Sequence, residues 1–147
     1  MTIPILNTSV PELDTNSSHY NFVVNAWLRS YRFSHFAVNV PNILYFENHQ
    51  KIVNRLLENS SLMLAVNSED RDQLCGFLCY SATPGMFTTH YIYVKKIFKR
   101  HKIATNMLKD AGLETTSTHL ATHANRSFEE LCKSLQVRFT YNPYGLF

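Results

Sequence analysis

The chain has 147 residues, 45% of them hydrophobic and 13% aromatic, which is enough apolar side chain to bury a core and excludes a disordered segment. A formal net charge of +3 admits an anionic ligand but does not require nucleic acid. No run approaches the roughly 18 apolar residues of a membrane span, and no secretory signal is visible. Three cysteines fit a reducing compartment better than a disulfide framework. We therefore expect a single domain over residues 1–147, located in the cytoplasm.

The first half of the chain predicts two amphipathic helices after a polar N-terminal segment. Residues 3–6 favour a short edge strand, and the polar residues that follow favour a loop that ends in a helix cap at Asp14, Ser17 or Ser18. Apolar residues recur at helical spacing over 20–31 and again over 43–59. Both segments therefore predict helices with one buried face, joined by a connection over 34–41.

Three strands are predicted next, the first two as a hairpin. Residues 61–66 and 74–81 are apolar runs separated by a polar turn, and residues 88–94 are rich in β-branched and aromatic side chains. Cys75 and Cys79, four residues apart on the second strand, would share one face about 13 Å apart. That separation is too large for a disulfide, so we expect both to be buried thiols.

The segment 86–111 predicts a strand, a compact basic turn and a helix over 103–112. The turn carries several cationic side chains: Lys95, Lys96, Lys99, Arg100 and Lys102. N–H groups in the first turn of a helix lack intrahelical partners, and the helix dipole is positive there. A strand that runs directly into such a helix end is a candidate site for a phosphate-bearing ligand. A solvated basic turn without a ligand fits the same residues.

The C-terminal part predicts a short strand over 117–121, a helix over 126–135 and a last strand over 136–141. From residue 20 onward the predicted order is helix, helix, strand, strand, strand, helix, strand, helix, strand. His119 and His123 are either surface residues or neighbours of a cleft. No spacing of His and Cys favours a metal site, and we expect none.

From residue 92 to residue 104 the sequence resembles the acyl-CoA-binding motif of the GNAT superfamily of N-acyltransferases. In that motif a strand ending in an apolar residue, any residue and Val runs into Arg/Gln-x-x-Gly-x-Gly/Ala, and a helix follows. The chain matches it without a gap through Ile92-Tyr93-Val94 and Lys99-Arg100-His101-Lys102-Ile103-Ala104. Lys99 stands where Arg or Gln is usual, and Lys102 stands where the first Gly is expected.

The resemblance implies that main-chain groups near the Val pair with pantetheine and that N–H groups of the turn hold the diphosphate of acetyl-CoA. The residues that would bind this cosubstrate are Tyr93, Val94, Lys99, Arg100, His101, Lys102, Ile103, Ala104 and Thr105. It also implies an α/β (α+β) fold with a mixed, mostly antiparallel sheet of about six strands flanked by about four helices.

A second segment, VVNAWLRSYRFS, resembles a stretch of small phage-encoded GNAT-like proteins. In GNAT folds the first helix and the loop after it line the acceptor side of the cleft. Arg29, Tyr31 and Arg32 are therefore candidates for contact with the acceptor; a solvated helix end is the other interpretation. A phage-encoded protein would work in the cytoplasm of its host.

Acyl transfer to an amine needs a base for the amine, a polarised carbonyl and an acid for the leaving thiolate. His90 matches one of two strand histidines proposed as the base in the arylalkylamine N-acetyltransferases of this superfamily, and the other falls on Thr88. The superfamily often has a Tyr acid in Asn-x-x-Ala-x-x-Leu-Tyr near the C-terminus, and Cys132 occupies that position here. Cys132 and Tyr141, or Tyr144, are therefore the candidates for the acid.

Together these residues predict an N-acetyltransferase that moves the acetyl group of acetyl-CoA to an unidentified primary amine by direct attack. The alternative is a binding protein on the same fold with weak or no catalysis, such as a phage factor that docks a host protein, because Lys102 and Cys132 depart from the motif. A nucleic-acid binder is disfavoured by eleven acidic residues and by the lack of a known binding motif. We expect no membrane partner, and a homodimer remains open.

Overall fold

The computed structural model describes residues 4–10, 17–34 and 37–145, apart from the side chains of Arg100 and His101. In this part of the chain six strands form one sheet in the order β1-β2-β3-β4-β5-β6. Their bounds are β1 (Ile5–Val10), β2 (Ser61–Asn67), β3 (Asp70–Thr83), β4 (Met86–Val94), β5 (Thr118–Ala121) and β6 (Thr140–Tyr141). Strands β1 to β4 pair antiparallel, whereas β5 pairs parallel with both β4 and β6. The predicted mixed, mostly antiparallel sheet is confirmed.

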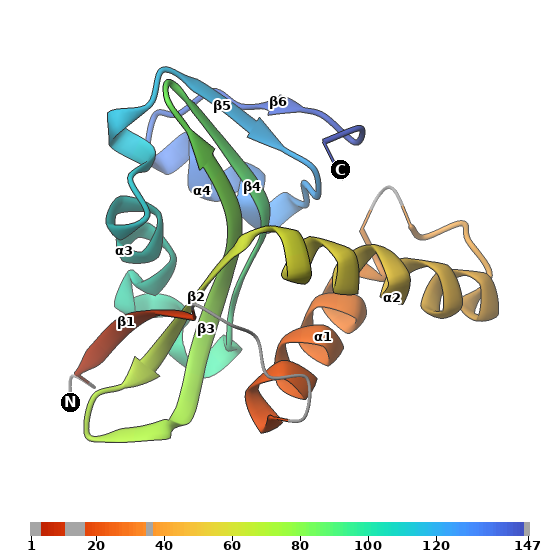
Figure 1. The fold of residues 1–147 in the computed structure, drawn as a ribbon, viewed down its shortest axis with the longest axis horizontal. Helices are drawn as coiled ribbons and strands as arrows, with labels where there is room; N and C mark the ends of the chain where they lie inside the picture. Colours follow the sequence, from red (N-terminus) through yellow and green to blue (C-terminus); the bar gives the residue numbers. More distant parts are fainter. Residues whose placement is uncertain (1–3, 11–16, 35–36, 146–147) are drawn as a thin grey trace.

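Helices cover both faces of this sheet (Figure 1). In the described residues they are α1 (Ser18–Tyr31), α2 (Asn42–Asn59), η1 (Lys96–His101), α3 (Ile103–Asp110), η2 (Leu113–Thr115) and α4 (Arg126–Ser134), where η1 and η2 are short 3₁₀ helices. Helices α1 and α2 share a core cluster with Phe77, and α3 shares another with Leu78, the next residue of β3. Because neighbouring strand residues point to opposite faces, the two clusters lie on opposite sides of the sheet. Helix α4 packs beside β5 against Ala121.

Local sequence explains where α1 and α4 begin. Ser17 is the N-cap of α1, and its hydroxyl oxygen accepts the N–H of Tyr20 at 3.1 Å. Asn125 is the N-cap of α4, and its Oδ1 accepts the N–H of Phe128 at 2.8 Å. Each cap satisfies one of the first-turn N–H groups that a helix leaves without a partner. Among the described helices, none combines the length and the apolar character needed to cross a membrane.

The sheet opens between β4 and β5. Their parallel pairing runs from Met86 and Thr118 to Thr89 and Ala121, with one further bond from the N–H of Thr122 to the carbonyl of Thr89 at 3.1 Å. Strand β4 continues to Val94, and over that length its pairing is with β3 alone. The far half of β4 therefore has one main-chain edge that no strand of the described chain covers.

Of the three register shifts in the sheet, two skip a single residue and so reverse the alternation of side chains there. Between β2 and β3 the register skips Cys75, and between β3 and β4 it skips His90. The first bulge places Cys75 in the core beneath α3 and Cys79 in the core beneath α1 and α2. The predicted sharing of one face by the two cysteines is therefore wrong, because an extra residue in one strand shifts the alternation by one position. Both are buried free thiols, as expected.

Most predicted elements lie within a few residues of the observed ones, and three strands differ. Strand β1 covers Ile5–Val10 rather than residues 3–6, of which Ile3 lies outside the described part. Strand β3 covers Asp70–Thr83 rather than residues 74–81, because polar residues at both ends of the strand also pair with its neighbours. Only Thr140–Tyr141 of the strand predicted over 136–141 pairs with β5. Gln136 has φ 57°, so the chain turns there instead of extending.

Candidate functional site

A cavity of about 580 Å³ lies where β4 parts from β5. We call it the strand-gap cavity. One wall is the open half of β4, and the others come from the end of α1, the basic turn with the start of α3, and α4. The residues that line it are Ser30, Tyr91, Ile92, Tyr93, Val94, Lys99, Lys102, Ala104, Thr105, Asn125, Ser127, Phe128, Glu130 and Leu131.

The main chain of β4 is directed into this cavity at alternate residues. The N–H of Lys95 donates to the carbonyl of Cys75 on β3 at 2.8 Å. Main-chain groups alternate between the two edges of an antiparallel strand, so those of Ile92 and Val94 face away from β3, toward the open edge. Gly76 lies opposite Val94, and a Cβ at this glycine would come within 2.5 Å of the carbonyl oxygen of Tyr93. The absence of a side chain there lets the two strands pair closely at the cavity wall.

The basic turn lies at the other end of the cavity. Lys99 and Lys102 both line it. Lys102 has φ 55° and ψ 27°, the left-handed conformation that a glycine adopts without cost, and α3 begins at the next residue. Ala104 and Thr105, in the first turn of α3, also line the cavity. Cationic side chains and a helix N-terminus thus meet at one mouth of the cavity, an arrangement that favours an anion.

The other predicted CoA-binding residues have different positions. Tyr93 and Val94 line the cavity, whereas the side chain of Ile103 is buried in the core beneath α3. The side chains of Arg100 and His101 lie outside the described part of the structure. Glu130 brings a negative charge to the lining, and it forms an exposed ion pair with Arg126 at 3.3 Å. The described lining therefore carries two lysines and one paired carboxylate.

Tyr91 lies at the inner end of the cavity. Its ring stacks on Trp27 of α1, with centroids 5.1 Å apart and planes 6° apart. Its hydroxyl is 2.5 Å from the hydroxyl of Ser30 and accepts the side-chain N–H of Asn125 at 3.3 Å. Burial raises the pKa of the Tyr91 phenol to about 12, so it is protonated at neutral pH. A second hollow of about 540 Å³ continues from this point and shares Ser30, Asn125 and Ser127 with the cavity.

His90, the predicted base, lies behind this wall rather than in it. The ring is 3% exposed, and both nitrogens have partners: Nε2 is 2.8 Å from the hydroxyl of Ser81 and Nδ1 is 3.0 Å from the hydroxyl of Thr122. Burial lowers the pKa of His90 to about 4, so it is neutral at pH 7. His90 is the bulge residue of β4, and it is not among the residues that line the strand-gap cavity.

The two predicted acids also lie away from the cavity. Cys132 is buried at 5% exposure in the cluster between α4 and β5, and burial raises the pKa of its thiol to about 11. Tyr141 is the last residue of β6, which pairs with β5, and it lines a pocket on the opposite side of Tyr91. Neither side chain lines the strand-gap cavity. The motif position of Cys132 falls on the core face of α4, whereas Phe128 and Leu131 reach the cavity.

The three residues predicted to contact the acceptor lie in different surroundings. Tyr31 is 3% exposed and lines the pocket that contains Tyr141. Arg32 folds onto its own loop: its guanidinium donates to Asn42 Oδ1 and to the carbonyls of Ala37 and Val40, at 2.8, 2.6 and 2.6 Å. Arg29 is exposed near the end of α1 and lines neither the cavity nor this pocket. Of the three, Tyr31 alone borders a hollow described here.

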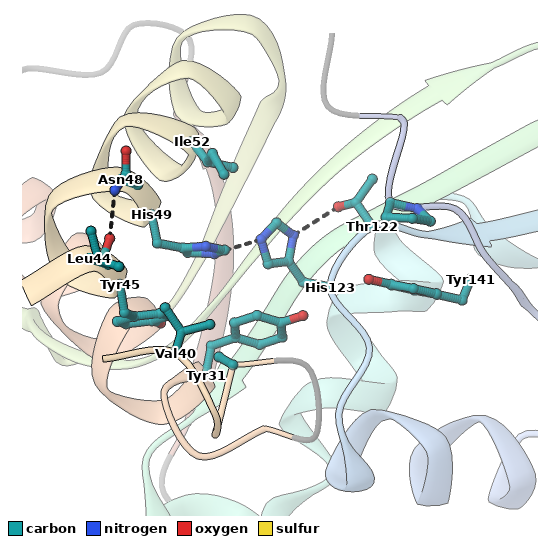
Figure 2. Close-up of a pocket in the computed structure, with 12 residues that line it drawn as sticks. Tyr31, Val40, Leu44, Tyr45, Asn48, His49, Ile52, Thr122, His123 and Tyr141 are labelled. Carbon is teal, nitrogen blue, oxygen red and sulfur yellow. Dashed lines mark hydrogen bonds between the residues drawn. The ribbon is translucent and has the colours of Figure 1, made fainter. Parts of the chain in front are cut away.

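The pocket that contains Tyr31 and Tyr141 has a volume of about 350 Å³ (Figure 2). We call it the aromatic pocket. It lies between α2, the end of α1 and the segments that follow β5 and β6. The residues that line it are Tyr31, Ala37, Val40, Leu44, Tyr45, Asn48, His49, Ile52, Thr122, His123, Tyr141 and Pro143.

A chain of hydrogen bonds joins this pocket to His90. The Nε2 atoms of His49 and His123 are 2.9 Å apart, and Figure 2 shows the two rings meeting across the pocket. His123 Nδ1 is 3.0 Å from the hydroxyl of Thr122, which in turn is 3.0 Å from His90 Nδ1. Beyond His90 the chain continues to the half-buried Ser81, whose hydroxyl donates to that of Ser60 at 3.4 Å. Burial lowers the pKa of His49 to about 4 and that of His123 well below its usual range.

The three imidazoles are therefore neutral at pH 7 and can pass a proton in either direction along the chain. Within the described residues no group of three His, Cys, Asp or Glu side chains is arranged to hold a metal ion. Sequence reasoning did not find this cluster. His49 and His123 are 74 residues apart, and nothing in the local pattern of either residue points to the other.

Comparisons with known proteins bear on the fold. No family model matches the sequence, and no curated protein matches it. Solved structures do match. A GNAT-family acetyltransferase from Streptococcus pneumoniae TIGR4 superposes with a TM-score of 0.56 at 13% identity, over 91% of this chain and 87% of that one.

Two further structures match to a similar degree. A ribosomal-protein-alanine N-acetyltransferase from Brucella melitensis gives a TM-score of 0.52 at 16% identity, over 89% of each chain. An integron cassette protein from the mobile metagenome of V. cholerae gives 0.55 at 15% identity, over 93% of this chain and 87% of that one. At these identities the likeness concerns the fold, and the chain has the fold of the GNAT-family acetyltransferases.

Proposed function

We propose that this protein is an N-acetyltransferase that binds acetyl-CoA in the strand-gap cavity. The observation that carries the proposal is the meeting, at one cavity, of an uncovered β4 edge and a basic turn that opens a helix. Pantetheine contains amide groups that can pair with the main chain of Ile92 and Val94, and its diphosphate suits Lys99, Lys102 and the first turn of α3. The residues present therefore fit this cosubstrate.

Bound acetyl-CoA supplies a thioester: the amine nitrogen forms a C–N bond to its carbonyl carbon, the C–S bond breaks, and sulfur leaves with the electron pair. The protein must take one proton from the nitrogen and give one to the sulfur. We assign the donor to the Tyr91 hydroxyl, which is protonated at neutral pH and lies in the cavity. This replaces Cys132 and Tyr141, which lie elsewhere.

For the amine proton we keep His90 as the base, acting at a distance. The acceptor side of the sheet carries His123, and Thr122 links it to His90. A proton taken up at His49 Nδ1 moves one proton along each hydrogen bond, from His49 to His123, from His123 to Thr122 and from Thr122 to His90 Nδ1. His90 Nε2–H then passes one to Ser81, whose hydroxyl donates to Ser60. Each of these groups donates and accepts in its neutral form, and the added charge leaves the core when the half-buried Ser81 or Ser60 at the end of the chain releases a proton to water.

Isothermal titration with acetyl-CoA tests the proposal. We expect binding by the wild-type protein and a loss of about threefold to tenfold in affinity for Lys99→Ala, because a charge-assisted contact to phosphate contributes about 1 kcal/mol at a partly exposed site. Lys96→Ala is the matched control: Lys96 is exposed in the same turn but does not line the cavity. The proposal fails if the wild type gives no binding, or if the two variants lose affinity equally.

Three earlier expectations stay predictions: a cytoplasmic location, a phage origin and a homodimer. The proposal depends on none of them.

A further inference from the structure

We infer that the aromatic pocket holds the acceptor, and that the acceptor is an aromatic amine without formal charge at neutral pH. The inference rests on the proposed function, and it names the class of substrate that the same site takes. It is argued from the lining of the pocket, from its place beside the strand-gap cavity and from the absence of charged side chains among the residues that line it.

The walls of the pocket are aromatic. The ring of His49 stacks on Tyr45 with centroids 5.1 Å apart and on Tyr31 at 5.3 Å, with planes 10° and 23° apart. The ring of His123 meets Tyr31 edge-on at 4.8 Å. A pocket of about 350 Å³ is at the small end of the range for ligand sites. A flat ring of one or two cycles suits both the volume and the walls.

Among the described lining residues there is no Asp, Glu, Lys or Arg. Arg32 lies over the Tyr45 ring, 5.2 Å from its centroid, and its nitrogens already donate to residues 37–42. An ammonium or carboxylate group placed here would lose water without meeting a side chain of opposite charge among the described lining residues, which disfavours it. The polar groups that line the pocket belong to uncharged side chains: Asn48, His49, Thr122, His123 and the tyrosines Tyr31, Tyr45 and Tyr141.

The pocket lies beside the place where acetyl transfer would occur. Its floor includes Thr122 and His123, the residues that follow β5 where β5 parts from β4. Tyr91 lies between the two hollows: its ring centroid is 6.0 Å from that of Tyr31 and 6.4 Å from that of His123, while its hydroxyl faces the strand-gap cavity. An acceptor in the aromatic pocket would therefore be separated from the strand-gap cavity by the Tyr91 ring. Aromatic amines are uncharged at neutral pH, so such an acceptor needs no carboxylate to receive it.

The test measures binding of 4-methylaniline to the full chain by isothermal titration or ligand-observed NMR, without acetyl-CoA. Leu44→Trp fills the rim of the pocket, and Leu44 is 53% exposed, so folding should not suffer. Ile43→Trp is the control, because Ile43 is 79% exposed and does not line the pocket. Leu44→Trp is expected to weaken binding about tenfold or more, and Ile43→Trp to leave it unchanged. Benzylamine, a charged analogue of similar size, should bind about tenfold more weakly than 4-methylaniline.

Equal binding of benzylamine, binding insensitive to Leu44→Trp, or no binding at millimolar 4-methylaniline would overturn the inference. The acetyl-CoA titration of the same samples separates the two proposals. If acetyl-CoA binds and the ring does not, the acceptor assignment alone is wrong. If the ring binds as expected and acetyl-CoA does not, the transferase proposal fails, and the role of the ring as its acceptor fails with it.

Discussion

Gly76 pairs with Val94 at the wall of the strand-gap cavity, where a Cβ would come within 2.5 Å of the Tyr93 carbonyl oxygen. Because main chain rather than a flexible side chain is in the way, Gly76→Ala should destabilise the protein by about 1–3 kcal/mol. Chemical denaturation measures this. Gly145→Ala is a milder comparison, since its new Cβ would mainly meet side-chain atoms at 3.2 Å or more. Equal losses at both positions would contradict this account of the strand packing.

Tyr91 is the residue to which we assign the proton for the leaving sulfur. Tyr91→Phe keeps the ring stacked on Trp27 and removes the hydroxyl, so acetyl transfer should slow by about 10²-fold while acetyl-CoA affinity changes little. Steady-state turnover and titration of the same variant check both parts. Tyr93→Phe, in the same cavity, should leave turnover near the wild-type value. Undiminished turnover by Tyr91→Phe would remove the assignment.

At single residues, the sequence predicted the special backbone position of Lys102 but not the direction in which some buried side chains point. Lys102 was identified as a residue in a glycine's place, and it does have a positive φ of 55°. The sequence could not predict which face of the sheet the side chains of Cys75 and His90 point to. Each lies at a β-bulge, and an extra residue in an apolar strand has no recognisable sequence signal. The orientation of Cys132 could be predicted only from its helix partners. Cys132 faces the core cluster at β5, Leu131 lines the cavity, and Phe128 borders both.

Asn125, at the start of α4, contributes both to helix stability and to the proposed active site. Its Oδ1 caps the helix, and its Nδ2 donates to the Tyr91 hydroxyl. Asn125→Ala should lower the free energy of unfolding by about 1 kcal/mol through loss of the cap. Asn125→Asp keeps the capping oxygen but not the donor, so its stability should stay near the wild-type value while turnover falls. Denaturation and turnover of the two variants measure these effects, and an Asp variant as unstable as the Ala variant would contradict the capping role.

Whole elements were predicted where local pattern and tertiary structure agree. The helices predicted over 43–59 and 126–135 follow from apolar residues at helical spacing, and the strand predicted over 88–94 follows from β-branched and aromatic residues. Each lies within two residues of the observed bounds. The last strand was predicted too long, because only two of its residues, Thr140 and Tyr141, pair with β5. The gap between β4 and β5 is a property of the sheet, and the sequence indicated it only through the resemblance of residues 92–104 to a known motif.

For the molecule as a whole, the buried histidines make stability depend on pH. Burial lowers the pKa of His90 from 6.5 to about 4 in the folded protein. As pH falls, the unfolded chain protonates His90 before the folded protein does. The part of the folding stability that depends on neutral His90 is therefore complete above pH 6.5 and is lost as pH falls toward 4. At pH 5 the loss from His90 alone is about 2 kcal/mol. His49 and His123 act in the same direction.

Denaturation between pH 7 and pH 5 measures this loss, in a range above the usual pKa of most carboxylates. His90→Gln keeps a polar side chain at the bulge and should flatten the dependence. A wild-type protein equally stable at pH 7 and pH 5 would show that the imidazoles are not held neutral by burial.

A crystal structure of the protein with CoA tests the central claim most directly. The account predicts pantetheine along the open edge of β4 from Ile92 to Val94, and the diphosphate within hydrogen-bonding distance of the main-chain N–H groups that begin α3 after Lys102. A nucleotide bound elsewhere on the molecule, or a strand-gap cavity filled by the side chain of Lys102, would contradict it.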